Sequence, residues 1–443
     1  MTQARTTVKP ADTTGYVAVI GLGYIGLPLA VSLAAGGHRV VGVDTDPGVR
    51  AAVRAGTPRF HEPGLPEQLR ALPPGALTVE EHLPDAAPDA VVVCVGTAVH
   101  ADNQRPDLRH LVAAVTEVAD RVTDRTLVVV RSTVPVGTCR NTVLPLLRKR
   151  VREPLLAFCP ERTIQGRAME ELRSLPQIVG GLDERSVLSA GRLMATCATD
   201  QVVVSSLEAA EMIKLICNAH TDLIYGFGNE VALLAERLGL DADELIASAN
   251  LRYPRPDLSR PGFVGGSCLV KDPYLLMHSG HETGHQMPMV AAARAVNESL
   301  PGRLVDRVTK ALAAAGKDSA DTKVLVCGIA YKGRPATDDT RGSAAVQLAQ
   351  ELGPRVGTLA GHDFTVGRDR IAEIGFRPVN LTEGLRDADA VIVLTDHPDY
   401  GTLRAENLLE QMRPDPVVFD MWGLLQNELA DLAGLTYLRL GRG

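Results

Sequence analysis

One cysteine of the chain stands in a setting that suits chemistry better than packing. Cys268 lies in PGFVGGSCLVKDP at 261–273, where glycines and prolines break regular helix and strand. A buried structural thiol is one interpretation, since free cysteine is among the most buried residue types. The other is a nucleophile, because glycines let a ligand approach the backbone and the cation of Lys271 favours a thiolate. Other motifs of the chain must then indicate which ligand such a thiolate would attack.

A lysine and an asparagine share one face of an expected helix. Lys214 and Asn218 are four residues apart in EMIKLICN at 211–218, and residues at that spacing point from the same side of a helix. A solvated helix face explains many single lysines. The neighbouring residues are markedly apolar, so the pair also fits a polar site, and both interpretations stay open.

Two further stretches place polar side chains after expected strands. In FCPER at 158–162, Glu161 is either a positioned base or half of a loop-end ion pair with Arg162, and the residues alone favour the ion pair. In RSTVPVGT at 131–138, hydroxyls and a glycine follow a strand. That pattern fits helix capping and a ligand-facing loop at the carboxyl edge of a sheet equally well.

The elements that position these residues begin with a nucleotide-binding pattern. The apolar run VAVI at 17–20 leads into Gly21-Leu-Gly23-Tyr-Ile-Gly26, a helical stretch follows, and a second strand ends in Asp44. In this context a pyrophosphate sits at the helix N-terminus and the carboxylate binds ribose hydroxyls. A carboxylate repels a 2′-phosphate, so NAD is favoured over NADP. The competing interpretation is a tight turn without a ligand.

Alternation of strands and helices indicates the fold class. Apolar runs of β type lie at 90–95, 127–130, 177–180, 390–394 and 417–419. Runs of this kind separated by helices predict parallel sheets with helices on both faces. Between the two α/β regions, apolar residues at three-and-four spacing predict helix over about 207–250 and 288–315, although Gly226 and Gly228 weaken the first locally.

Composition narrows the class of protein. The 443 residues suffice for two or three domains, and 45% hydrophobic with 22% charged residues is typical of a soluble globular protein. A net charge of −7 argues against nucleic acid as a partner, and no apolar run has the length of a membrane span. Seven cysteines without CxxC spacing indicate reduced thiols in a cytoplasm. HSGHETGH at 278–285 is predicted to be a surface loop without a metal.

Together these stretches resemble the UDP-glucose/GDP-mannose dehydrogenase family, the nucleotide-sugar 6-dehydrogenases, over nearly all of the chain after residue 15. The resemblance is carried by GLGYIG, EPGL at 62–65, STVPVGT at 132–138, CPER at 159–162, AEMIKLICN at 210–218, GGSCLVKDP at 265–273, and GIAYKG and DDTRGS between 328 and 343. Their order and spacing are specific, whereas GxGxxG alone occurs in many families.

The resemblance implies a four-electron oxidation of a sugar C6 alcohol to the uronic acid, with two NAD per sugar. It implies that Cys268 adds to the intermediate aldehyde as a thiohemiacetal, which becomes a thioester that water cleaves. It also implies oxyanion stabilisation by Lys214 and Asn218, water or proton handling by Asp272 and Thr133, and acid–base work in hydrolysis by Glu161.

Further contacts follow from the same resemblance. The expected NAD contacts are Gly21, Gly23, Tyr24, Ile25, Gly26, Asp44, Thr97, Ser132, Thr133 and Lys271. The expected contacts to the nucleoside-diphosphate sugar are Glu161, Arg162, Lys214, Asn218, Phe263, Gly265, Lys332 and Arg341, of which the last two are cations suited to a pyrophosphate. The family's dimerisation through its middle domain implies a homodimer or higher homo-oligomer, with neither a membrane nor a nucleic acid as partner.

We therefore predict an α/β fold with two Rossmann-like doubly wound parallel-sheet domains joined by a helical middle domain. The expected parts are a flexible tail at 1–15, which lacks the apolar core of a secretory signal, an NAD-binding domain at 16–206, a central helical and dimerisation domain with the cysteine loop at 207–316, and a nucleotide-sugar-binding domain at 317–443.

Departures from the family pattern bear on the substrate. Gln165 stands where many UDP-glucose enzymes carry a second glutamate, Trp422 where arginine is common, and Thr97-Ala98 where the family has Thr-Pro. We predict a UDP-glucose or TDP-glucose type of substrate, with UDP-N-acetylmannosamine as the alternative. A two-electron hydroxyacid-type dehydrogenase and a non-catalytic NAD sensor are further alternatives, and both leave Cys268 without a role.

Overall fold

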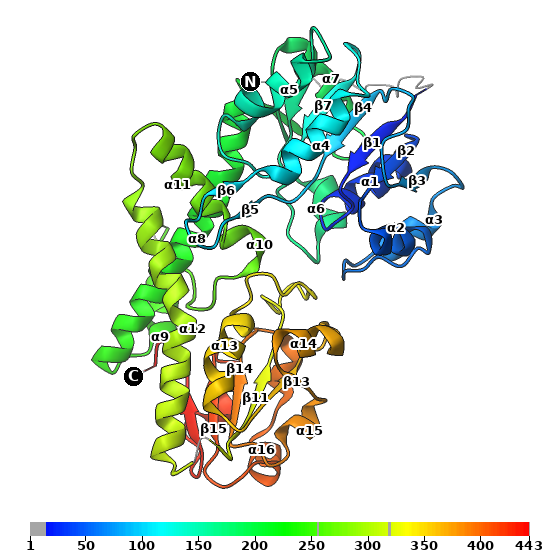
Figure 1. Cartoon of the computed structure of the whole chain (residues 1–443). Helices are drawn as coiled ribbons and strands as arrows, with labels where there is room; N and C mark the ends of the chain where they lie inside the picture. The colour runs from blue at the N-terminus through cyan, green and yellow to red at the C-terminus, as the bar shows by residue number, and fades with distance from the viewer. Residues whose placement is uncertain (1–14, 255–256, 318–319, 443) are drawn as a thin grey trace. The chain divides into compact units, whose positions relative to one another are not determined.

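The computed structural model describes residues 15–254, 257–317 and 320–442 (Figure 1). The chain forms two compact units, of which the first holds residues up to 217 with 274–285 and the second holds the others. The division falls inside helix α8 (Leu207–Leu238), so this helix belongs to both units. The tail predicted at 1–15 lies outside the described residues except for Gly15.

The first unit is built on a sheet of eight described strands in the order β10-β9-β8-β7-β4-β1-β2-β3. Their bounds are β1 (Val17–Ile20), β2 (Val40–Val43), β3 (Leu77–Glu80), β4 (Ala90–Val93), β7 (Leu127–Val130), β8 (Leu155–Phe158), β9 (Gln177–Gly181) and β10 (Gln201–Val203). The strands from β3 to β8 are parallel, as predicted. β9 is antiparallel to β8, so the parallel prediction was wrong for 177–180, which lie between β8 and the edge strand β10. Antiparallel strands are common near the edge of an otherwise parallel sheet.

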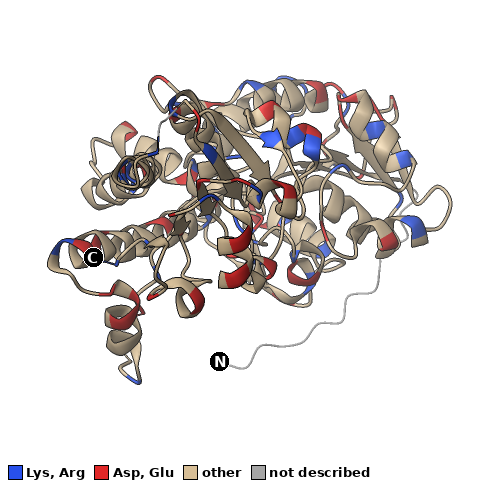
Figure 2. Cartoon of the chain, turned by 90° about the horizontal axis from the view of Figure 1, so that it is seen from below, with Lys and Arg blue, Asp and Glu red and all other residues tan. Residues whose placement is uncertain are grey.

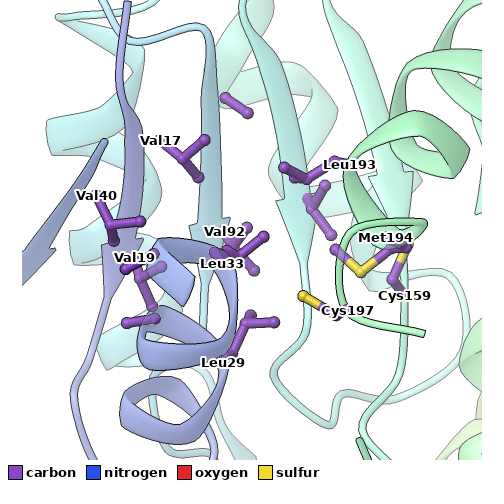
Figure 3. Close-up of a cluster of buried hydrophobic side chains, with 14 of the residues drawn as sticks. Val17, Val19, Leu29, Leu33, Val40, Val92, Cys159, Leu193, Met194 and Cys197 are labelled. Atoms are coloured by element: carbon purple, nitrogen blue, oxygen red, sulfur yellow. The ribbon is translucent and has the colours of Figure 1, made fainter. Parts of the chain in front are cut away.

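Helices cover the sheet of the first unit and bury its apolar strands. They are α1 (Gly26–Ala35), α2 (Pro47–Arg54), α3 (Leu65–Ala71), α4 (Arg109–Ala119), α5 (Leu144–Arg148), α6 (Ala168–Ser174) and α7 (Glu184–Met194). Figure 3 shows Val19 and Val92 of two parallel strands beside Leu29 and Leu33 of α1. Because β1, β2, β4, β7 and β8 are buried on both faces, they read in the sequence as continuous apolar runs.

The middle of the chain is helical, as predicted. It consists of α8, α9 (Ala242–Asn250), α10 (Gly266–Leu269), α11 (Asp272–Glu282) and α12 (Pro288–Ala314). Two expectations fail here. Cys268 lies in the one-turn helix α10 rather than in an irregular stretch, and His278 and His281 belong to α11 rather than to a loop. Gly266 and Pro273 therefore lie in the first turns of α10 and α11 without preventing these helices.

The second unit contains a parallel sheet of six described strands in the order β13-β12-β11-β14-β15-β16. The strand bounds are β11 (Lys323–Cys327), β12 (Thr358–His362), β13 (Arg377–Pro378), β14 (Ala390–Val393), β15 (Val417–Asp420) and β16 (Thr436–Leu438). The helices between them are α13 (Ala344–Leu352), α14 (Arg368–Ile374), α15 (Leu381–Leu385), α16 (Ala405–Gln411) and α17 (Gln426–Leu429). Strand order reverses between β11 and β14, and ligands of such sheets bind outside the carboxyl ends at that point.

The distribution of charges, the apolar character of the helices and the state of the cysteines bear on what the composition predicts. Figure 2 shows acidic and basic residues interspersed along the ribbon. Across the described ranges, no helix combines the length and apolar character needed to cross a membrane. All seven cysteines are free.

Candidate active site

The glycine turn has the geometry of a dinucleotide-binding loop. Gly21 has φ +87°, a conformation that glycine adopts at little cost. A Cβ at Gly26 would overlap the carbonyl oxygen of Gly21, whereas one at Gly23 would meet nothing within 4 Å. The first glycine thus makes the turn, the third allows close packing, and the second leaves open space at the start of α1. These are the three roles of the dinucleotide fingerprint.

Two polar groups near this turn also fit NAD. Asp44 accepts hydrogen bonds from the backbone N–H groups of Leu22 (2.8 Å) and Asp46 (2.9 Å), and each of its oxygens keeps a lone pair for a ribose hydroxyl. Thr97 is 9% exposed, and its hydroxyl has no hydrogen-bond partner in the described part of the chain. Because a buried polar group without a partner is costly, this hydroxyl is suited to a ligand.

The loop that contains Thr133 is held from two helices. Glu211 of α8, fully buried, accepts hydrogen bonds from the N–H groups of Gly137 (2.5 Å) and Cys139 (2.8 Å). Ser279 of α11 accepts one from Val136 (3.0 Å). Burial raises the pKa of Glu211 more than these hydrogen bonds lower it. The loop therefore has a fixed backbone, and its hydroxyls stand on a rigid support.

Glu161 forms a buried ion pair, although not with the predicted partner. Its carboxylate accepts hydrogen bonds from the guanidinium of Arg131 (2.6 and 3.2 Å). It also accepts them from the backbone N–H groups of Arg162 (2.7 Å) and Thr163 (2.8 Å). The guanidinium of Arg162 instead donates to the Pro176 carbonyl. Burial raises the pKa of Glu161, but Arg131 and the hydrogen bonds outweigh it, so the pKa is lowered. Glu161 is therefore ionised, and its geometry anchors the loop.

Lys214 is buried in the first unit and acts electrostatically on the same carboxylate. Only 7% of the residue is exposed, and its positive charge is one of the influences that lower the pKa of Glu161. A buried lysine inside an apolar helix is uncommon. The site interpretation of Lys214 is therefore favoured over a solvated helix face.

The cysteine segment lies in the second unit. Cys268 is partly exposed. A Cβ at Gly266 would come within 2.8 Å of the ring of Tyr331, and one at Gly265 within 2.7 Å of the Gly342 carbonyl oxygen. The glycines thus let the loop after β11 press against the cysteine segment, as the sequence suggested in general terms.

A hydrogen-bonded carboxylate links the cysteine segment to α8. Asp272 is fully buried. One of its carboxylate oxygens accepts a hydrogen bond from Lys271 Nζ (2.7 Å), and the other accepts one from Asn218 Nδ2 (2.5 Å). The cation of Lys271 is thus shared with Asp272 and is not reserved for the thiol of Cys268. Asn218 keeps a second amide hydrogen for a ligand.

The predicted diphosphate cations occupy the loop after β11. Lys332 Nζ lies 5.4 Å from the centroid of the Tyr331 ring, and Lys332 lines a small pocket beside Phe364 and His397. Arg341 makes a two-pronged ion pair with Asp339, with N–O distances of 2.8 to 3.2 Å. Arg341 therefore already has a carboxylate partner.

Several residues that hold this site have no predicted role. Arg131 and Glu211 are two of them, although Glu211 precedes Lys214 by three residues and so shares its helix face. That spacing was the available signal. For Arg131 no local pattern identifies its partner, which lies 30 residues away.

The fold and these groups define an NAD-dependent dehydrogenase with two Rossmann-like sheets. The chain belongs to the UDP-glucose/GDP-mannose dehydrogenase family, because its NAD binding domain, central domain and UDP binding domain match residues 16–197, 208–299 and 325–427. NAD is the cofactor, as predicted.

Similar proteins include enzymes named for two different sugars. A UDP-N-acetyl-D-mannosamine dehydrogenase of Pyrococcus horikoshii is 32% identical over 96% of this chain and 99% of that protein. A structure of UDP-D-ManNAc dehydrogenase from the same organism has a TM-score of 0.87 at 30% identity and covers 97% of this chain and 99% of that one. The UDP-glucose dehydrogenase structure from Pyrobaculum islandicum has a TM-score of 0.85 at 30% identity and covers 99% and 100%.

The glycine turn gives a test that separates packing from ligand approach. We expect Gly26→Ala to lower both NAD affinity and the free energy of unfolding, the latter by about 1–3 kcal/mol through overpacking. Gly23→Ala should weaken NAD binding about tenfold, or about 1.4 kcal/mol, without changing stability, because its Cβ meets no protein atom. Calorimetric titration with NAD and urea denaturation measure both. Unchanged NAD affinity in Gly23→Ala would contradict the assignment.

The buried ion pair gives a pH test. The pKa of Glu161 is lowered in the folded state, so its contribution to stability is present above the unfolded-state pKa and is lost as pH falls through the folded-state pKa. Glu161→Gln should cost about 3–5 kcal/mol at pH 7, because Arg131 stays buried without its anion, and the cost should shrink in acid. Urea denaturation from pH 7 down to about pH 2.5 measures this, because the loss begins only near the ordinary glutamate pKa of 4.5 and continues below it. The exposed Glu170→Gln is the control, and a cost for Glu161→Gln that does not change with pH would refute the assignment.

Proposed function

We propose that this chain oxidises the C6 alcohol of a nucleoside-diphosphate sugar to the uronic acid in two NAD-dependent steps, with Cys268 as the nucleophile. The observation that carries the proposal is the setting of Cys268. Its thiol is partly exposed in a one-turn helix, and the same segment continues into Lys271 and the fully buried Asp272, which binds Asn218. A structural thiol requires none of these groups.

The proposed reaction proceeds through two hydride transfers and one hydrolysis. When bound, the nicotinamide accepts a hydride. Loss of a hydride and a proton converts the alcohol to the aldehyde, and the Cys268 thiolate then adds to the aldehyde carbon. A second hydride leaves the thiohemiacetal, and water cleaves the resulting thioester to release the acid and the thiol. We assign Lys214 and Asn218 to the oxyanion, because both carry N–H donors on one face of α8.

The remaining residues receive narrower proposed roles. Thr133, on its fixed loop, holds the water or relays a proton, and Asp272 orients Asn218 through a hydrogen bond. Glu161 keeps Arg131 and its own loop in place, and a lowered pKa makes it a weak base. The proposed functional parts are 16–206 for NAD, 207–316 for the cysteine and dimerisation, and 317–443 for the nucleotide sugar.

The names of the relatives favour one sugar. The Pyrococcus enzymes are named for UDP-N-acetyl-D-mannosamine and the Pyrobaculum enzyme for UDP-glucose. We therefore propose UDP-N-acetylmannosamine ahead of UDP-glucose. A panel of UDP- and TDP-sugars, with NADH counted per sugar consumed, tests this. Two NADH per sugar support the proposal, one supports a hydroxyacid-type enzyme, and no turnover of any sugar supports an NAD sensor.

Substitution of Cys268 tests the nucleophile directly. Cys268→Ala should lower turnover to acid by on the order of 10³-fold or more, because loss of a covalent nucleophile costs that much in other enzymes. NAD affinity should not change, because Cys268 lies outside the glycine turn. The control is Cys217→Ala, which removes the exposed cysteine of α8. Full activity in Cys268→Ala would remove the central assignment.

We also propose a homodimer through α8. Phe227, Leu234 and Leu238 form an exposed apolar stripe, at 52%, 58% and 63% exposure, on the side of α8 opposite its buried polar residues. Exposed apolar patches of this kind mark protein interfaces, and a second copy is the partner the family implies.

The stripe predicts a change of oligomeric state. A Phe227→Glu/Leu234→Glu variant should elute as a monomer at micromolar concentration, because buried charges destabilise an apolar interface. Leu188→Glu, which alters an exposed leucine of α7, should not change the mass. Light scattering after size exclusion measures it, and a variant that keeps the wild-type mass would show that another surface makes the oligomer.

A further inference from the structure

Two asparagines hold the segment that leads to Cys268. The side-chain amide of Asn250 accepts the N–H of Leu258 and donates to its carbonyl, each at 2.9 Å. The amide of Asn229 does the same for Gly262, accepting its N–H at 2.7 Å and donating to its carbonyl at 3.0 Å. Such paired hydrogen bonds fix a backbone position without a sheet or helix. The second pair lies six residues before the thiol.

The Asn229 contact is part of a buried polar network that reaches both sides of Cys268. Asn229 is fully buried and donates to Asn297 Oδ1 (2.8 Å). Asn297 donates to the carboxylate of Asp222 (2.9 Å), which pairs with Arg294 (2.6 Å). Arg294 also donates to the carbonyl of Leu269, at 3.4 Å. The helix pair α8 and α12 thus holds the backbone before and just after the thiol.

Close packing reinforces these hydrogen bonds. A Cβ at Gly228 would overlap the Ser259 carbonyl oxygen, and one at Gly226 would come within 2.9 Å of the Ala293 methyl group. On the other side, a Cβ at Gly262 would overlap the ring of Trp422. The two glycines that weaken α8 in a propensity argument are therefore the points where the loop and α12 contact it.

We propose that Asn229 is a positioning residue for the Cys268 thiolate and acts through the backbone of Gly262. This rests on the proposed role of Cys268 as nucleophile. The segment between them contains Gly265 and Gly266, whose backbones are intrinsically flexible. Attack on an aldehyde needs the sulfur in a narrow range of positions, and an error of 1 Å can cost about 10²-fold in rate. A rigid anchor before a flexible segment meets that need.

The first experiment measures the loop without any assay of activity. Amide hydrogen exchange of the purified full chain should be faster across 262–269 in Asn229→Ala than in wild type, by about tenfold or more. Asn250→Ala breaks an equivalent pair farther from the thiol and should affect mainly residues near Leu258. Leu408→Ala, a core substitution in α16 within a different apolar cluster, controls for general destabilisation and should leave 262–269 as in wild type. The milder Asn229→Ser serves if the alanine variant does not fold.

The second experiment measures the step that needs the thiol. With the favoured UDP-sugar, Asn229→Ala should lower kcat by about 10- to 100-fold, with KM for NAD unchanged. The first hydride transfer does not need sulfur, so the share of product trapped as aldehyde by a hydroxylamine reagent should rise. Leu408→Ala should leave that share at the wild-type value.

The outcomes separate the two proposals. Faster exchange with a raised aldehyde share supports positioning. Unchanged exchange across 262–269, or faster exchange with an unchanged aldehyde share, overturns it. If wild type oxidises none of the sugars, the proposed function fails, whereas the exchange result still decides whether Asn229 holds the loop.

Discussion

The structure depends on one buried polar face of α8. Glu211, Lys214, Asn218, Asp222 and Asn229 follow one another at spacings of three, four, four and seven residues, so they lie along a single side of the helix. Three of them hold different functional segments, each within its own compact unit. The hydroxyl loop is held by Glu211, the aspartate beside the cysteine segment by Asn218, and the backbone before the cysteine by Asn229. A continuous helix keeps these contacts in fixed order.

Burial of these polar groups is tolerated because nearly every charge has a partner. Burial raises the pKa of Asp222 even beside Arg294, while Arg131 and the hydrogen bonds bring that of Glu161 below its ordinary value. The desolvation of two ions is repaid only where geometry and extra hydrogen bonds are good. Within the described residues, Asp222 Oδ2 and Arg294 Nε have no hydrogen-bond partner, so their network is satisfied only in part. The satisfied hydrogen bonds give rigidity, which donors aimed at a developing oxyanion require.

Several glycines of the chain allow two segments to pack closely against each other. Gly26 allows the start of α1 to meet the turn at Gly21, Gly228 allows the cysteine loop to meet α8, and Gly262 accommodates Trp422. Trp422 stands where the family commonly has arginine, and its indole N–H donates to the Leu394 carbonyl. This tryptophan therefore has a packing role under the cysteine loop, in a unit that carries the expected diphosphate cations.

The sequence by itself determined the fold class and NAD, because glycine turns, apolar strands and a terminal aspartate are local patterns that keep their meaning along the chain. It indicated the family as well, through a resemblance carried by the order and spacing of several motifs. It also brought Lys214 and Asn218 to one helix face. Only the tertiary structure decided that Glu161 pairs with Arg131, that Lys271 is shared with Asp272, and that β9 runs antiparallel. The reason is physical: the partner of a buried charge and the direction of a neighbouring strand are decided by contacts between distant segments, which no local periodicity records.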